Sequence, residues 1–93
     1  MIVGLLELDV RLPEAQSLKA KRMVIRSLRD RIRNKFNVSV AEVDGGDACQ
    51  RGVIGIAHVS NEQQFSNQVL SKIVNLVENE RAIEVVDYRL TFV

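Results

Sequence analysis

Of the 93 residues, 46% are hydrophobic and 27% are charged. This composition and length suit a soluble protein with one hydrophobic core, so we expect residues 1–93 to form a single domain. No apolar run approaches the ~18 residues of a membrane span, and the first ten residues carry acids but no basic segment. These features argue against a membrane span and a signal peptide, and we expect a cytoplasmic protein. The net charge is +1, but positive and negative side chains are concentrated in different parts of the chain.

The first half of the chain predicts a strand followed by a helix. Residues 2–11 alternate between two faces as a β-strand does, and Pro13 ends the segment. Ser17 is a suitable N-cap for a helix that extends to about Phe36. The apolar arc of this helix, which we expect to face the core, consists of Leu18, Val24, Ile25, Leu28 and Ile32.

The same helix concentrates the positive charge of the protein. Residues 17–36 hold eight of the thirteen Lys and Arg residues and one acid, or about +7, whereas the rest of the chain has five bases and eleven acids, or about −6. Five of the cations lie within about 80° of one another on one flank of the helix, over some 20 Å. We call these five residues the basic stripe: Lys19, Arg22, Arg26, Arg29 and Arg33.

Lys21 does not belong to the basic stripe, because it projects into the middle of the apolar arc. One interpretation is that its stem lies along apolar surface while its ammonium group reaches solvent past the edge of the sheet. The other is that it points into a groove that holds an anion.

The second half of the chain predicts a β-hairpin, a helix and a last strand. Segments 36–43 and 48–59 alternate as strands, and Asp44-Gly45-Gly46-Asp47 between them is a tight-turn sequence. Ser60 and Gln63 fit a capping box for a helix that runs to about Asn79, and Asn61 is an alternative cap. The predicted core stripe of that helix is Phe65, Val69, Ile73, Leu76 and Val77. Segment 83–93 predicts the last strand, with Val86, Tyr88, Leu90 and Phe92 on one face.

The order β-α-β-β-α-β predicts an α+β, ferredoxin-like split arrangement. It would have a four-stranded antiparallel sheet of order 4-1-3-2 with both helices on one face. The open face would carry Val3, Leu5, Val53, Val59, Val85 and Val93 beside Glu7, Arg51, Asp87 and Arg89. Because this face is too apolar to be purely solvated, we expect it to be a self-association or partner surface, with a homodimer as the expected assembly.

Two segments carry a family resemblance: SLKAKRMVIRSLRDRIRNKFNVSVAEVD, and CQRGVIGIAHVSN after it. They resemble the YlxP-like family of small, uncharacterised bacterial proteins, and the resemblance covers nearly the whole chain. It implies a ferredoxin-like fold, no established activity, and genes that often lie beside those for translation and ribosome-maturation factors. One position departs from the family: Cys49 precedes Gln50 where relatives are expected to have a large aromatic residue, so this chain lacks whatever that aromatic contributes.

The basic stripe and the implied gene neighbourhood favour a non-catalytic protein that binds structured RNA, on the ribosome or on a ribosomal precursor. The candidate contacts to RNA or another anion are Lys19, Lys21, Arg22, Arg26, Arg29 and Arg33. A solvated basic helix face is the other interpretation of these residues. Base stacking on the sheet, as in an RRM, is not expected, because the open positions of the central strands hold Val3, Leu5, Arg51 and Val53. We expect neither DNA nor a membrane as partner.

An alternative function is an oligomeric small-ligand or regulatory domain, with Lys21 and the turn at 44–47 lining an anion or metabolite pocket at a subunit boundary.

We do not expect an enzyme. His58, the only histidine, alternates with Ile54 and Ile56 toward the core, and a single cysteine, Cys49, excludes a disulfide or a cysteine-based metal site. Glu42, Asp44 and Asp47 could hold a hard cation, but acids around Gly-Gly are ordinary turn residues. We therefore expect no catalytic residue, metal or cofactor.

Overall fold

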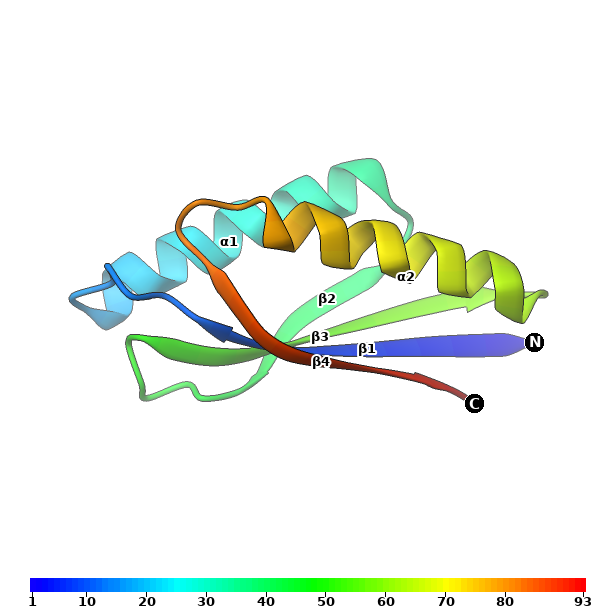
Figure 1. Cartoon of the computed structure of the whole chain (residues 1–93), viewed down its shortest axis with the longest axis horizontal. Coiled ribbons are helices and arrows are strands. Elements are labelled where there is room, and N and C mark those ends of the chain that lie inside the picture. Colours follow the sequence, from blue (N-terminus) through cyan, green and yellow to red (C-terminus); the bar gives the residue numbers. More distant parts are fainter.

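The sheet has β1 and β3 at its centre, with β2 and β4 at its edges. A computed structural model describes residues 1–93. Its elements are β1 (Ile2–Arg11), α1 (Leu18–Lys35), β2 (Ser39–Asp44), β3 (Arg51–Ser60), α2 (Gln63–Glu78) and β4 (Glu84–Phe92). The antiparallel strands follow the order β2-β3-β1-β4, and both helices cover one face of the sheet (Figure 1). This is the order 4-1-3-2 read from the other edge, so the predicted ferredoxin-like α+β fold is confirmed.

The core lies between the sheet and the two helices. On β1, Leu6, Leu8 and Val10 are fully buried, and their partners on β3 are Ile56, Ile54 and Gly52. Because strand side chains alternate between two faces, the even-numbered residues of both central strands meet the helices and the odd-numbered residues form the open face. The alternation that the sequence predicts for both strands is therefore confirmed.

The first helix begins as predicted. Ser17 is its N-cap, and the Ser17 Oγ accepts a hydrogen bond from the backbone N–H of Ala20 at 3.0 Å. Leu28 and Ile32 are fully buried against the sheet, while Val24 packs at the margin of the core. The predicted apolar arc thus attaches α1 to the sheet and leaves its other flanks open to solvent.

The second helix begins differently from the prediction. Its N-cap is Glu62, which makes no side-chain capping hydrogen bond. The Ser60 Oγ instead donates to the Glu62 carbonyl at 2.8 Å and accepts from the Glu62 N–H at 3.2 Å. The predicted capping box of Ser60 and Gln63 is therefore wrong, because Ser60 closes a turn that precedes the helix.

The buried face of α2 is rotated from the predicted one. Its buried residues are Ser66, Leu70, Ile73, Val74 and Val77. Phe65 is half exposed at the edge of this face, and its ring lies against the imidazole of His58 with 5.7 Å between ring centroids. The prediction omitted Leu70 and Val74, although with Ile73 and Val77 they have the three- and four-residue spacing of a buried helix face. It also omitted Ser66, because Ser66 is polar, although its hydroxyl has partners in the core.

β4 also departs from the prediction at one position, because a β-bulge shifts its register against β1 between Asp9 and Val10. Val85 pairs with the buried Val10 and packs against the core, whereas Val86 is about half exposed. Strict alternation predicts the reverse for these two valines. That prediction is wrong because one extra residue in a strand reverses the faces that follow it.

His58 is buried within this fold and has a polar partner. Its Nδ1 lies 2.8 Å from the Ser66 Oγ, and the same oxygen lies 2.8 Å from the Ser60 Oγ. These three side chains form a short polar network between β3 and α2. The expectation that His58 faces the core is confirmed.

Replacement of Ser66 by Ala is expected to lower the free energy of unfolding by about 1–3 kcal/mol, because a buried ring nitrogen of His58 loses its hydrogen-bond partner. Urea denaturation followed by circular dichroism measures the change. Asn67→Ala, at the exposed neighbouring position, is the matched control and should change the free energy by less than about 0.5 kcal/mol. Equal stability of the two variants would show that the network contributes nothing to the fold.

Candidate nucleic-acid interface

The basic stripe lies on the flank of α1 that faces the edge strand β2. A cleft of about 180 Å³ runs between this flank and β2. Arg22, Arg26 and Arg29 line it from the helix, and Val40 and Glu42 line it from the strand. The structure thus brings three of the predicted contact residues together along one cleft, with Lys19 and Arg33 continuing the line toward the two ends of the helix.

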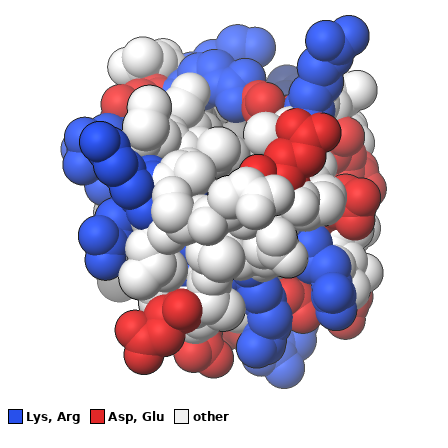
Figure 2. All heavy atoms as spheres, turned by 90° about the vertical axis from the view of Figure 1, so that its left-hand side faces the viewer, with Lys and Arg blue, Asp and Glu red and all other residues white.

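Most of the charge on the basic stripe is not neutralised within the protein. Lys19, Arg22, Arg26 and Arg33 are exposed, and none has a carboxylate within 4.0 Å. Arg29 is the exception, with its Nε 3.7 Å from Asp30 Oδ1 and without a hydrogen-bond partner. At the end of the molecule at which α1 begins, Lys and Arg side chains project around an uncharged centre, interspersed with Asp and Glu side chains (Figure 2). Free cations in a row attract an extended polyanion.

Lys21 lies apart from the basic stripe and is fully buried, with 1% of its surface exposed. Its Nζ donates to the carbonyl oxygens of Gly45 and Ala48, at 2.5 and 2.6 Å, and lies 2.8 Å from the Glu42 Oε2. An ammonium group has three protons to donate. The two carbonyl oxygens accept two of them, and the Glu42 carboxylate neutralises the charge. Lys21 therefore neither reaches solvent nor presents its ammonium group to an external anion, and both interpretations of this residue from the sequence are corrected.

Gly52 makes room for the Lys21 side chain on the helix-covered face of β3. A Cβ at Gly52 would lie 3.0 Å from the Glu42 Oε2 and 3.6 Å from the Lys21 Cε. Any larger residue would displace the carboxylate that neutralises the buried ammonium group. The glycine, the lysine and the glutamate are thus parts of one arrangement that joins α1 to β2 and to the turn before β3.

Two of the three acids near this turn, Glu42 and Asp44, have partners within the protein. Glu42 pairs with Lys21, and the Asp44 Oδ1 accepts a hydrogen bond from the N–H of Gly45 at 2.7 Å. Gly45 itself has a φ of 81°, the left-handed conformation that glycine adopts without strain. Cys49 is half-buried in the turn that follows, where the sequence predicted a strand, because β3 begins at Arg51.

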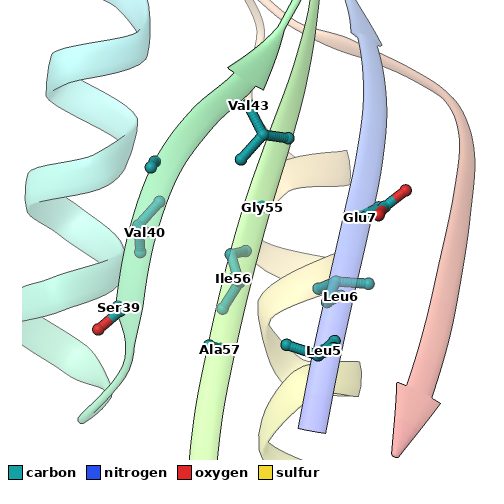
Figure 3. A pocket seen from close by; sticks show the side chains of 10 residues that line it. Leu5, Leu6, Glu7, Ser39, Val40, Val43, Gly55, Ile56 and Ala57 are labelled. Atoms are coloured by element: carbon teal, nitrogen blue, oxygen red, sulfur yellow. The ribbon is translucent and has the colours of Figure 1, made fainter.

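The open face of the sheet forms a second candidate surface. An apolar cavity of about 360 Å³ lies on β1, β2 and β3, with Leu5, Val43, Gly55 and Ala57 among the residues that line it (Figure 3). Gly55 leaves room for Val43, since a Cβ at this position would lie 2.9 Å from a methyl group of Val43 and would force a shift. The exposed hydrophobic residues at the margins of this face include Val59 and Val93.

The other half of the open face is charged. An Arg89 nitrogen lies 2.9 Å from the Glu7 Oε2, and the Arg51 Nε lies 3.9 Å from the Asp9 Oδ1. Both pairs are largely exposed, so they contribute little to stability. This face therefore combines apolar surface with charges of both signs, which is a pattern that can complement itself across a two-fold axis.

Sequence reasoning missed the partners of Lys21 and the contact between the basic stripe and β2. Helical spacing identifies a lysine in an apolar arc, but it cannot show that two carbonyl groups and Glu42, more than 20 residues away, converge on it. One signal was available: Gly52 alternates with core residues on β3, and a glycine in a strand often marks the close approach of another group.

Lys21→Met is expected to lower the free energy of unfolding by about 2–4 kcal/mol, because it leaves two carbonyl groups and the Glu42 carboxylate without their donor. Chemical denaturation measures this. Lys19→Met, on the exposed side of the same turn, is the matched control and should cost less than about 0.5 kcal/mol. If both variants lose the same small amount, the buried ammonium group does not hold the turn in place.

Neither helix has the length and apolar character that crossing a lipid bilayer requires. A family model described as "Protein of unknown function (DUF503)" matches residues 3–90. The chain is also 34% identical over 83 residues to "Uncharacterized protein YlxP" from Bacillus subtilis (strain 168), in an alignment that covers 89% of this chain and 90% of that protein. The resemblance seen in the sequence is confirmed, and the chain belongs to the YlxP-like family of proteins of unknown function, DUF503.

Proposed function

We propose that this chain is a non-catalytic, cytoplasmic RNA-binding protein that associates with the ribosome or with a ribosomal precursor through the basic stripe. The observation that carries the proposal is the row of cations on one flank of α1, four of which have no acidic partner in the protein. The implied gene neighbourhood of the family directs the proposal to ribosomal RNA in particular.

The spacing of the basic stripe suits a phosphate backbone. Successive cations are three or four residues apart, which is about 4.5–6 Å along the helix axis. Cations at this spacing along one side of a straight helix can each meet a phosphate of a backbone that runs beside the helix. Such contacts release counterions, fix the orientation of the protein and read no sequence.

No catalytic step forms part of this proposal. The only histidine is buried against Ser66, and Lys21 is occupied by three acceptors. Both side chains serve the fold, whereas the exposed groups at the cleft are arginines, which remain charged and bind phosphate through several N–H donors. The cleft therefore has the chemistry of binding rather than of proton transfer.

The proposal includes a homodimer formed through the open face of the sheet. Leu5, Val43, Val59 and Val93 leave large hydrophobic surfaces exposed on or beside this face. The basic stripe lies on α1, on the other face of the sheet, so dimerisation would leave it free. Two copies would then present two stripes to one RNA, which raises the overall affinity without any new contact.

Co-sedimentation with 30S, 50S and 70S particles over a salt series tests the RNA-binding function. Binding to one of these particles is expected, with an affinity that falls steeply as salt rises. The variant Arg22→Glu, Arg26→Glu, Arg29→Glu should lose most binding, and the slope of log affinity against log salt should fall by about three, one for each phosphate contact removed.

The matched control is the comparison of Arg26→Glu alone with Arg81→Glu, which changes the net charge equally at an exposed position outside both the basic stripe and the open face. Arg81→Glu should retain the wild-type salt slope. Circular dichroism verifies that both variants fold. Equal loss of binding in the two variants, or none in either, would mean that the basic stripe is not the RNA contact.

Val59→Lys is expected to convert the dimer to a monomer, because it places a charge on the apolar part of the open face. Light scattering at tens of micromolar protein measures the molecular mass. Met23→Lys is the matched control, since Met23 is 64% exposed, much as Val59 is at 61%, but lies on α1. A wild-type protein that is strictly monomeric at this concentration would refute the homodimer.

A further inference from the structure

A groove of about 710 Å³ lies between the two helices, on the flank of α1 that faces away from the basic stripe. Asn34, Lys35 and Phe36 line it from the end of α1, and Lys72 and Asn75 line it from α2. Its volume falls within the range of small-molecule binding pockets, about 300–1,000 Å³. The function of the basic stripe does not account for this groove, and the sequence pattern did not reveal it, because its sides come from helices separated by the β-hairpin.

The charged groups that line the groove are all cations. Lys35 and Lys72 have no carboxylate within 4.0 Å, whereas Arg31 is paired with Glu80 at the far side of the groove. No acid lines the groove itself. Two free ammonium groups on facing helices therefore create a positive potential between them, which favours a phosphate or another compact anion.

Carboxamide groups supply the second part of the groove. Asn34, Asn75 and Asn79 all line it, and Asn79 uses its Nδ2 to donate to the Asn75 carbonyl at 2.8 Å. The side chains of Asn34 and Asn75 make no hydrogen bond within the protein. Each can therefore offer one acceptor and two donors to a ligand. Adjacent donors and acceptors of this kind match the edge of a nucleobase, as in the bidentate contact of a carboxamide with adenine.

Phe36 gives the groove an aromatic side chain. It is the C-cap residue of α1, and its partly buried ring packs against the core while also lining the groove. An aromatic ring fixed in this way can pack against the face of an unpaired base or its ribose. The open sheet face offers no such ring at its centre, where the two middle strands expose Val3, Leu5, Arg51 and Val53.

We propose that this groove binds one unpaired nucleotide, with its phosphate near Lys35 and Lys72, its base edge on Asn34 and Asn75, and its ring or sugar against Phe36. The proposal rests on the RNA-binding function and deepens it, because the nucleotide would belong to a single-stranded part of the same RNA. The basic stripe would then provide affinity that does not depend on sequence, and the groove would provide base selection. A free mononucleotide has the same chemistry and is distinguished by the experiment.

The test measures fluorescence anisotropy with labelled 12-nucleotide RNAs of A, C, G or U and with an RNA duplex of equal length, each at two salt concentrations. The double variant Asn34→Ala, Asn75→Ala is expected to bind the preferred single strand about tenfold more weakly and to lose base preference, with its salt slope unchanged. Binding of the duplex should not change. Asn67→Ala, an exposed position of α2 outside the groove, is the matched control and should bind as the wild type does.

Three results separate this proposal from the function on which it rests. If the wild type binds RNA with a strong salt dependence but the double variant binds the single strands equally well, the groove is not a nucleotide site and the RNA-binding function stands. If no RNA binds, the RNA-binding function fails. The groove is then tested by itself: AMP, CMP, GMP and UMP are titrated into the protein, and the side-chain amide signals of Asn34 and Asn75 are followed by NMR. Shifts confined to these amides would assign the groove to a free nucleotide, and their absence would overturn the proposal.

Discussion

The buried ammonium group of Lys21 is the interaction on which the arrangement of α1, β2 and the following turn depends. Its Nζ joins the helix to the carbonyl oxygens of Gly45 and Ala48 and to the Glu42 carboxylate. A buried charge is tolerated when it is paired and hydrogen-bonded, and here the ammonium group donates to two carbonyl oxygens and pairs with a carboxylate. Removing the ammonium group would leave the Glu42 carboxylate without its counter-ion and the two carbonyl groups without their hydrogen-bond donor. The arrangement therefore depends on a lysine at this position.

This interaction also fixes the position of the basic stripe. A helix attached to a sheet by leucine and isoleucine contacts alone can rotate slightly about its axis, since hydrophobic contacts have little directional preference. Two directed hydrogen bonds and one ion pair at the first turns of α1 set the rotation, and with it the direction in which Arg22, Arg26 and Arg29 project. Lys21 therefore acts on the proposed RNA contact without touching RNA, by positioning residues that do.

The three candidate surfaces lie on separate parts of the fold. The basic stripe faces the β2 edge, the groove between the helices lies on the opposite flank of α1, and the apolar open face lies beneath the sheet. Because α1 separates the basic stripe from the groove, an RNA strand that follows the stripe could cross the end of the helix and place an unpaired nucleotide in the groove. Dimerisation through the sheet would obstruct neither. A small domain can thus combine backbone binding, base selection and self-association.

Most of the fold was predictable from the sequence because it rests on local patterns. Alternation with period two identified the strands, helical spacing identified both helices, and Ser17 marked the start of the first helix. In β4 the prediction failed because a single residue breaks the pattern: the bulge that reverses Val85 and Val86 leaves no signal in hydrophobic periodicity. In α2 two apolar stripes lie side by side, and the prediction chose the one next to the buried stripe of Leu70, Ile73, Val74 and Val77.

For the candidate site, the sequence determined the composition and spacing of the basic stripe, since residues three and four apart share one side of any helix. Only the tertiary structure decided which strand that side faces and what Lys21 binds. It also decided that Asn34 and Asn75 share a groove. The physical reason is that periodicity describes one segment at a time, whereas these contacts join segments far apart in the chain, and their distances are set by the packing of the whole domain.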